Sequence, residues 1–156
     1  MKKIKLLYRF LILINILTLI LIGVQTFGLV IPDLLGSRVS SISVLGRYNN
    51  LLLTTLLVII LAGSFKIQQG VKYMIKEGFF NPTSEIKFRM AGTIFIVFAI
   101  CRIIYIAVAM KDFKLNELIN NSILAFLVIL VGLGLLIFSD FIKNGGILKQ
   151  ENDLTI

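Results

Sequence analysis

The chain has 156 residues, 58% of them hydrophobic, with a mean hydropathy of +0.98 and a formal net charge of +8 at pH 7. Soluble domains hold about 45–50% apolar residues in short runs, whereas here the apolar residues form long runs, which excludes an ordinary soluble domain. The chain contains no histidine. It therefore lacks the most frequent general base and the most frequent transition-metal ligand, so we expect no catalytic residues, no metal site and no cofactor.

Four apolar segments follow one another along the chain. A helix needs about 20 mostly apolar residues to cross the hydrocarbon core of a bilayer. Segments close to that length are Phe10–Ile31, Tyr48–Phe65, Met90–Met110 and Leu118–Ser139. The first segment follows a basic N-terminus, as a signal peptide does, but its apolar run is longer than usual and no Ala-x-Ala site follows it. We expect an all-α membrane protein, a bundle of four transmembrane helices that forms one domain over residues 1–156.

Lysine and arginine are distributed unequally between the two sides that this arrangement creates. The N-terminal arm, the loop 66–89 and the tail 140–156 together hold eleven of them, and the other two loops hold four. Basic residues accumulate in cytoplasmic loops. The sequence therefore predicts that both termini and the loop 66–89 are cytoplasmic. Because the basic residues flank spans and form no separate module, we expect contact with the lipid bilayer and no direct binding of nucleic acid.

The loop 66–89 has helical signals of its own. Residues 67–76 are amphipathic, and this segment either lies along the membrane interface or continues the second span as a helix. Gly78 is suited to end a helix. Asn81 is suited to cap the next one, with Pro82 at its first position. The loop is either a simple connector or a surface for a partner or lipid.

The third span contains one charge, Arg102, which cannot be neutralised by losing its proton. At 1.5 Å per residue it lies about 12 Å from the outer end of that span. The same estimate places other polar side chains at similar depth, which gives a candidate intramembrane polar layer of Arg102, Gln25, Thr54, Thr55 and Tyr105. Arg102 either joins this layer inside the bundle, extends past Tyr105 to the headgroups, or binds a ligand or anion.

Two motifs carry a resemblance to a known family. These are the turn Gly78-Phe79-Phe80 and the tail Glu151-Asn152-Asp153-Leu154-Thr155-Ile156. With the four-span layout, they resemble a family of small bacterial plasma-membrane proteins catalogued as a domain of unknown function. Members are often encoded beside a small Cro-type helix-turn-helix regulator. The resemblance implies that both motifs are candidates for binding such a partner, and it implies no catalytic residue.

Two functions of different classes follow. The leading hypothesis is a non-enzymatic regulatory or scaffolding protein that acts through a small cytoplasmic transcriptional regulator. The alternative is a transport or channel-like protein, which would have to be a homo-oligomer because four spans leave little room for a polar path. A pore needs polar residues at several depths, whereas this sequence has only one polar layer and a polar cytoplasmic face.

Overall fold

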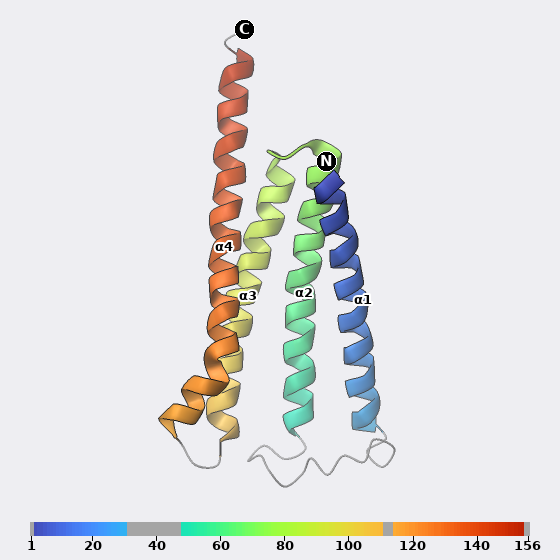
Figure 1. Ribbon diagram of the computed structural model, residues 1–156, viewed down its shortest axis with the longest axis vertical. Helices are drawn as coiled ribbons and strands as arrows, with labels where there is room; N and C mark the ends of the chain where they lie inside the picture. Colours follow the sequence, from blue (N-terminus) through green and yellow to red (C-terminus); the bar gives the residue numbers. More distant parts are fainter. Residues whose placement is uncertain (1, 31–47, 111–113, 155–156) are drawn as a thin grey trace.

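The computed structural model describes residues 2–30, 48–110 and 114–154 and places nearly all of them in four helices (Figure 1). These are α1 (Lys2–Val30), α2 (Tyr48–Glu77), α3 (Pro82–Ala109) and α4 (Leu115–Leu154). Each is long and apolar enough to cross a membrane. The expected fold class, an all-α chain with four spans, is confirmed, and the chain is a multi-pass membrane protein.

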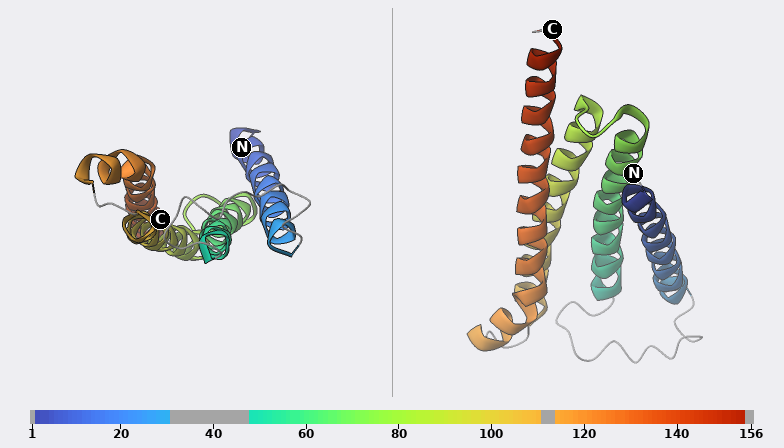
Figure 2. Two further views of the ribbon diagram at one scale, coloured as in Figure 1. Left: turned by 90° about the horizontal axis from the view of Figure 1, so that it is seen from below. Right: turned by 45° about the horizontal axis from the view of Figure 1, so that its top comes forward.

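The helices form an open row. Each packs against its neighbour in the chain, α1 on α2, α2 on α3 and α3 on α4. Seen along their axes, they follow a curve with α1 and α4 at its two ends (Figure 2). The bundle is therefore more open than a closed four-helix arrangement. The N-terminus and the α2–α3 turn lie together at one end of the molecule, here called the turn end, and the opposite end is called the far end.

The α2–α3 turn is short because the residues that end α2 and begin α3 lie close together in the sequence and act as expected. Gly78 has a φ of +94°, which glycine adopts without a steric penalty. Asn81 caps α3, since its Oδ1 accepts a hydrogen bond of 2.7 Å from the backbone N–H of Ser84. Pro82 takes the first helical position. These three predictions are confirmed, and only residues 78–81 separate the two helices.

The segment 66–89 is therefore almost entirely helical. Of the two arrangements expected for residues 67–76, the structure has the continuation of the second span, because α2 runs without a break to Glu77. The amphipathic part packs its apolar side inward: Val71 and Met74 belong to a core cluster at the turn end. Phe88 of α3 and Ile142 of α4 complete that cluster with Leu11 of α1.

Glycines set how closely neighbouring helices approach. A Cβ atom added at Gly70 would lie 2.8 Å from the ring of Phe88, and one added at Gly63 would lie 2.5 Å from the ring of Phe95. Each ring of α3 thus fills the place of a missing side chain on α2. Small residues allow such close approach in membranes, where lipid competes equally for apolar surface.

The fourth helix is the longest and extends beyond the others. Its 40 residues form one helix of about 60 Å, which projects past the α2–α3 turn (Figure 1). The expected tail 140–156 is helical through Leu154, continuous with the fourth span. Thr155 and Ile156, which belong to the tail motif, lie outside the described residues.

Candidate functional site

The α2–α3 turn docks on α4 through two aromatic rings. The ring of Phe79 lies 6.0 Å from that of Phe138 and 6.5 Å from that of Phe141, centre to centre and nearly perpendicular in each case. The ring of Phe80 occupies the space beside Gly145, where an added Cβ atom would lie 2.1 Å from it. Edge-to-face pairs of this kind are a favourable geometry for aromatic rings. The turn is thereby fixed to the point where α4 leaves the other helices.

Hydrogen bonds hold the turn from the other side. The hydroxyl of Ser84, fully buried, donates to the backbone carbonyl of Gly70 at 2.8 Å. Asn81 donates from its Nδ2 to the carbonyl of Gly78. A buried hydroxyl without a partner would be costly, so this pairing stabilises the close contact of α2 with the start of α3.

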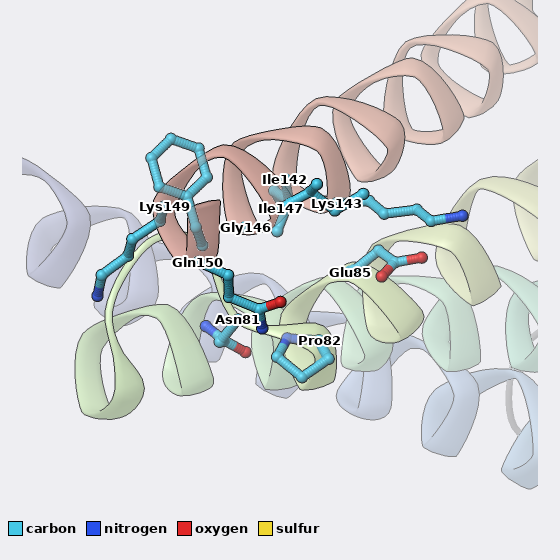
Figure 3. A pocket seen from close by; sticks show the side chains of 10 residues that line it. Asn81, Pro82, Glu85, Ile142, Lys143, Gly146, Ile147, Lys149 and Gln150 are labelled. Carbon is cyan, nitrogen blue, oxygen red and sulfur yellow. The ribbon is translucent and has the colours of Figure 1, made fainter. Parts of the chain in front are cut away.

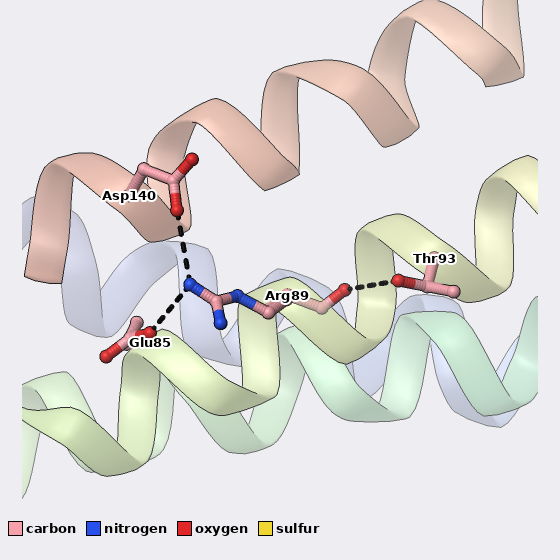
Figure 4. Close-up of polar contacts among 4 residues, drawn as sticks. All are labelled: Glu85, Arg89, Thr93 and Asp140. Atoms are coloured by element: carbon pink, nitrogen blue, oxygen red, sulfur yellow. Dashed lines mark hydrogen bonds and ion pairs between the residues drawn. The ribbon is translucent and has the colours of Figure 1, made fainter.

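An ion cluster links α3 to α4 one turn further into the molecule (Figure 4). The Nη2 atom of Arg89 lies 3.0 Å from Glu85 Oε1 in its own helix and 3.2 Å from Asp140 Oδ1 in α4. Arg89 and Asp140 are well exposed. Exposed pairs contribute at most about 1 kcal/mol, so this cluster mainly orients the two helices.

A pocket of about 330 Å³ opens between the start of α3 and the end of α4 (Figure 3). We call it the turn-end pocket. Its lining combines aromatic, apolar, acidic and basic side chains, namely Phe80, Asn81, Pro82, Glu85, Ile142, Lys143, Gly146, Ile147, Lys149 and Gln150. Its walls come from the α2–α3 turn, the start of α3 and the end of α4. The pocket therefore offers apolar, acidic and basic contacts side by side.

The candidate partner-binding residues lie in two places, the α2–α3 turn and the end of α4. Phe79 and Phe80 pack against their own α4, although both keep more than a third of their surface exposed. Gly78 is exposed at the end of α2. The tail residues Glu151, Asn152 and Leu154 lie on the outermost turns of α4, and they are exposed. Asp153 belongs to the same helix, and its side chain lies outside the described residues.

The structure brings only part of the candidate polar layer together. The hydroxyl of Thr54 lies 3.3 Å from Gln25 Oε1, but it also lies 2.8 Å from the carbonyl of Asn50 in its own helix. The Thr54 hydroxyl has one proton, which it donates mainly to the nearer carbonyl oxygen of Asn50. The hydrogen bond to Gln25, which would join α1 to α2, is therefore weak. Thr55 donates to the carbonyl of Leu51 in its own helix.

The other two members of the layer lie on α3. Tyr105 donates a hydrogen bond to Oδ1 of Asn49, a partner that the sequence analysis did not include in the layer. Arg102 is partly exposed, and its Nε atom is buried without a hydrogen-bond partner in the described part of the chain. Within the same residues, no bond joins Arg102 to Gln25 or to the two threonines.

One part-buried polar pair was missed by sequence reasoning. Asn15 of α1, only 5% exposed, donates a hydrogen bond to Gln68 of α2. The available signal was a single asparagine in the apolar run of the first span, and its partner Gln68 lies in the amphipathic segment 67–76. The pair is visible only when the register of the two helices is known.

The chemistry of these sites is that of packing and binding. Among the described residues, no group of three or more His, Cys, Asp or Glu side chains lies close enough to hold a metal ion. No protein-family model, no curated protein and no solved structure matches this chain. The resemblance drawn from the two motifs therefore stays a prediction.

Proposed function

We propose that this chain is a regulatory or scaffolding membrane protein without catalytic activity, which holds a small soluble partner at its turn end. The observation that carries the proposal is the end of α4. Residues Ile147–Leu154, here called the α4 extension, continue past the α2–α3 turn. Leu148 and Leu154 of this extension are 63% and 87% exposed. Apolar side chains that stay exposed on a helix outside the membrane support a surface that binds another protein.

The basic residues support a cytoplasmic position for the turn end. The eleven lysines and arginines of the N-terminal arm, the segment 66–89 and the tail flank that end of the molecule. Basic residues mark the cytoplasmic side. The resemblance adds a bacterial plasma membrane and a small helix-turn-helix regulator as the partner. The turn-end pocket beside the extension would hold a side chain of that regulator.

A crosslinked pull-down from native bacterial membranes tests the proposal. The full chain is compared with a version that ends at Gly146 and with the double variant Leu148→Ser, Leu154→Ser. The exposed Asn144→Ser change is the matched control on the same helix. We expect the full chain and the control to capture a small helix-turn-helix protein, and the other two to lose it. Equal capture by all four, or capture of no such protein by any, would contradict the proposal.

An oligomeric transport or channel-like protein is the second candidate. Its support is the open row of the four described helices, which enclose no path among themselves and leave the outer faces of α1 and α4 for contact with further copies (Figure 2). Ion or solute flux into liposomes that contain the purified protein would favour this candidate. The truncation at Gly146 should then leave flux unchanged, which separates the two functions.

A further inference from the structure

A groove lies between α1 and α2, at the opposite edge of the row from α4. It has a volume of about 540 Å³. Most of its wall is apolar: Ile16 and Leu19 come from α1, and Val58, Leu61 and Phe65 from α2. The lining residues span eleven positions of α2, from Val58 to Gln68, which corresponds to about 15 Å along the helix. One leaflet of a bilayer core has this depth, half of about 30 Å.

The groove becomes polar at the end that faces the turn end. There the part-buried pair of Asn15 and Gln68 forms part of its wall, together with Lys66. An occupant therefore needs an apolar body of one-leaflet length and a polar group at one end. A membrane phospholipid has this shape.

Further cations continue the two helix faces that form the groove. Arg9 lies three positions before Ile12 on α1, and Lys72 lies seven positions after Phe65 on α2. Residues at these spacings share a helix face. Both side chains are exposed, and Lys66 is half-buried. None of the three forms an ion pair with any residue in the described part of the chain.

Acidic residues are nearly missing from these two helices. The sequence of α1 contains no Asp or Glu, and that of α2 contains only its last residue, Glu77. Glu77 lies off the face of Phe65 and Lys72, at a spacing of five residues from the latter. The mouth of the groove therefore carries an uncompensated positive charge. A second copy of the chain would bring the same cations beside it and be repelled, whereas an anionic headgroup would be attracted.

We propose that the α1–α2 groove is a binding site for an anionic glycerophospholipid of the phosphatidylglycerol type. One acyl chain lies along the apolar wall, and the phosphate lies beside Lys66 with Arg9 and Lys72 around it. Basic pockets between transmembrane helices bind lipid headgroups in this way. The site does not depend on the α4 extension, so its failure would leave the proposed partner surface untouched.

Native mass spectrometry of the full chain in a mild non-ionic detergent tests the site. Phosphatidylglycerol and phosphatidylcholine are titrated separately, and the fraction of protein with one bound lipid is measured. A basic residue near an anionic headgroup contributes about 1 kcal/mol, which is a factor of about five in affinity. We expect phosphatidylglycerol to bind at least about fivefold tighter than phosphatidylcholine.

Three variants locate the site. Lys66→Gln should weaken phosphatidylglycerol binding about fivefold and leave phosphatidylcholine unchanged. Lys87→Gln removes the same charge at the start of α3, outside the groove, and should leave the affinity for both lipids unchanged. Ala62→Leu places a larger side chain into the groove from an exposed position of its apolar wall and should weaken the binding of both lipids. Equal affinity for the two lipids, equal effects of the two lysine changes, or unchanged binding to Ala62→Leu would overturn the proposal.

Discussion

The two outer helices of the row are attached to it by different means. α4 closes on α3 through glycines: a Cβ atom added at Gly92 would lie 2.7 Å from the carbonyl oxygen of Gly132, so the two backbones touch. Among the side chains of α1 that the structure describes, only Leu11 and Asn15 are buried, and a groove remains between α1 and α2. One edge of the molecule is closely packed, and the other is open.

The difference shows what selects contacts between equally apolar helices. Lipid tails cover an apolar side chain as well as another helix does, so apolarity alone gives no preference for helix contact. Direct contact between two helix backbones requires small residues that face each other. Gly92 of α3 and Gly132 of α4 face each other in this way. Gly23 of α1 faces no other helix closely, because a Cβ atom added there would meet nothing within 4 Å. The open α1–α2 edge is therefore the better place for a lipid, and the closed α3–α4 edge supports the projecting extension.

The largest effect is expected where the closed edge is forced apart. Gly92→Ile places a branched side chain against the backbone of Gly132 and should lower the free energy of unfolding by about 3 kcal/mol. Gly134→Ile is the matched control, because a Cβ atom at Gly134 of α4 meets nothing within 4 Å, and it should change the free energy of unfolding by about 0.5 kcal/mol or less. Unfolding by sodium dodecyl sulfate in mixed micelles measures both. Equal destabilisation would mean that the glycine contact does not hold this edge.

A smaller effect is expected where the turn docks on α4. Gly145→Ala brings a methyl group against the ring of Phe80, which can rotate away, so we expect a loss of about 1 kcal/mol. Gly146→Ala is the adjacent control, because its Cβ would lie 4.0 Å from the nearest neighbouring atom, the carbonyl oxygen of Phe80. Thermal unfolding in detergent compares the two. A larger loss in Gly146→Ala than in Gly145→Ala would contradict the docking of Phe80 beside Gly145.

The smallest effect is expected at the open edge. Interhelical hydrogen bonds in membranes average about 0.6 kcal/mol, so the pair of Asn15 and Gln68 should show a coupling energy of that size. A double-mutant cycle of Asn15→Ala and Gln68→Ala measures it. The cycle of Gln25→Ala and Arg102→Ala should be additive, because no hydrogen bond joins these side chains in the described structure. Strong coupling in the second cycle would restore the polar layer as one cluster.

Much of the fold follows from local signals. The apolar runs give the four helices, and Gly78, Asn81 and Pro82 give the turn between α2 and α3. These features depend on neighbours in the chain, which is why sequence reasoning reaches them. The candidate polar layer was placed by depth alone. Depth does not determine how each helix is rotated about its own axis. In the structure, the rotation of α3 lets Tyr105 donate its hydrogen bond to Asn49, and it leaves Arg102 without a bond to the other members of the layer.

By itself, the sequence determined that the chain has four helices long and apolar enough to cross a membrane. It also determined where α2 ends and where α3 begins at the turn between them. Hydrophobic run length and backbone capping act over a few residues, and they need no partner. The tertiary structure alone decided the open row and the packing of Phe79 and Phe80 on their own α4. It also decided the continuation of α4 beyond the turn and the groove beside Asn15. These depend on which helix faces meet, and in an apolar solvent that choice rests on the fit of a few glycines and rings.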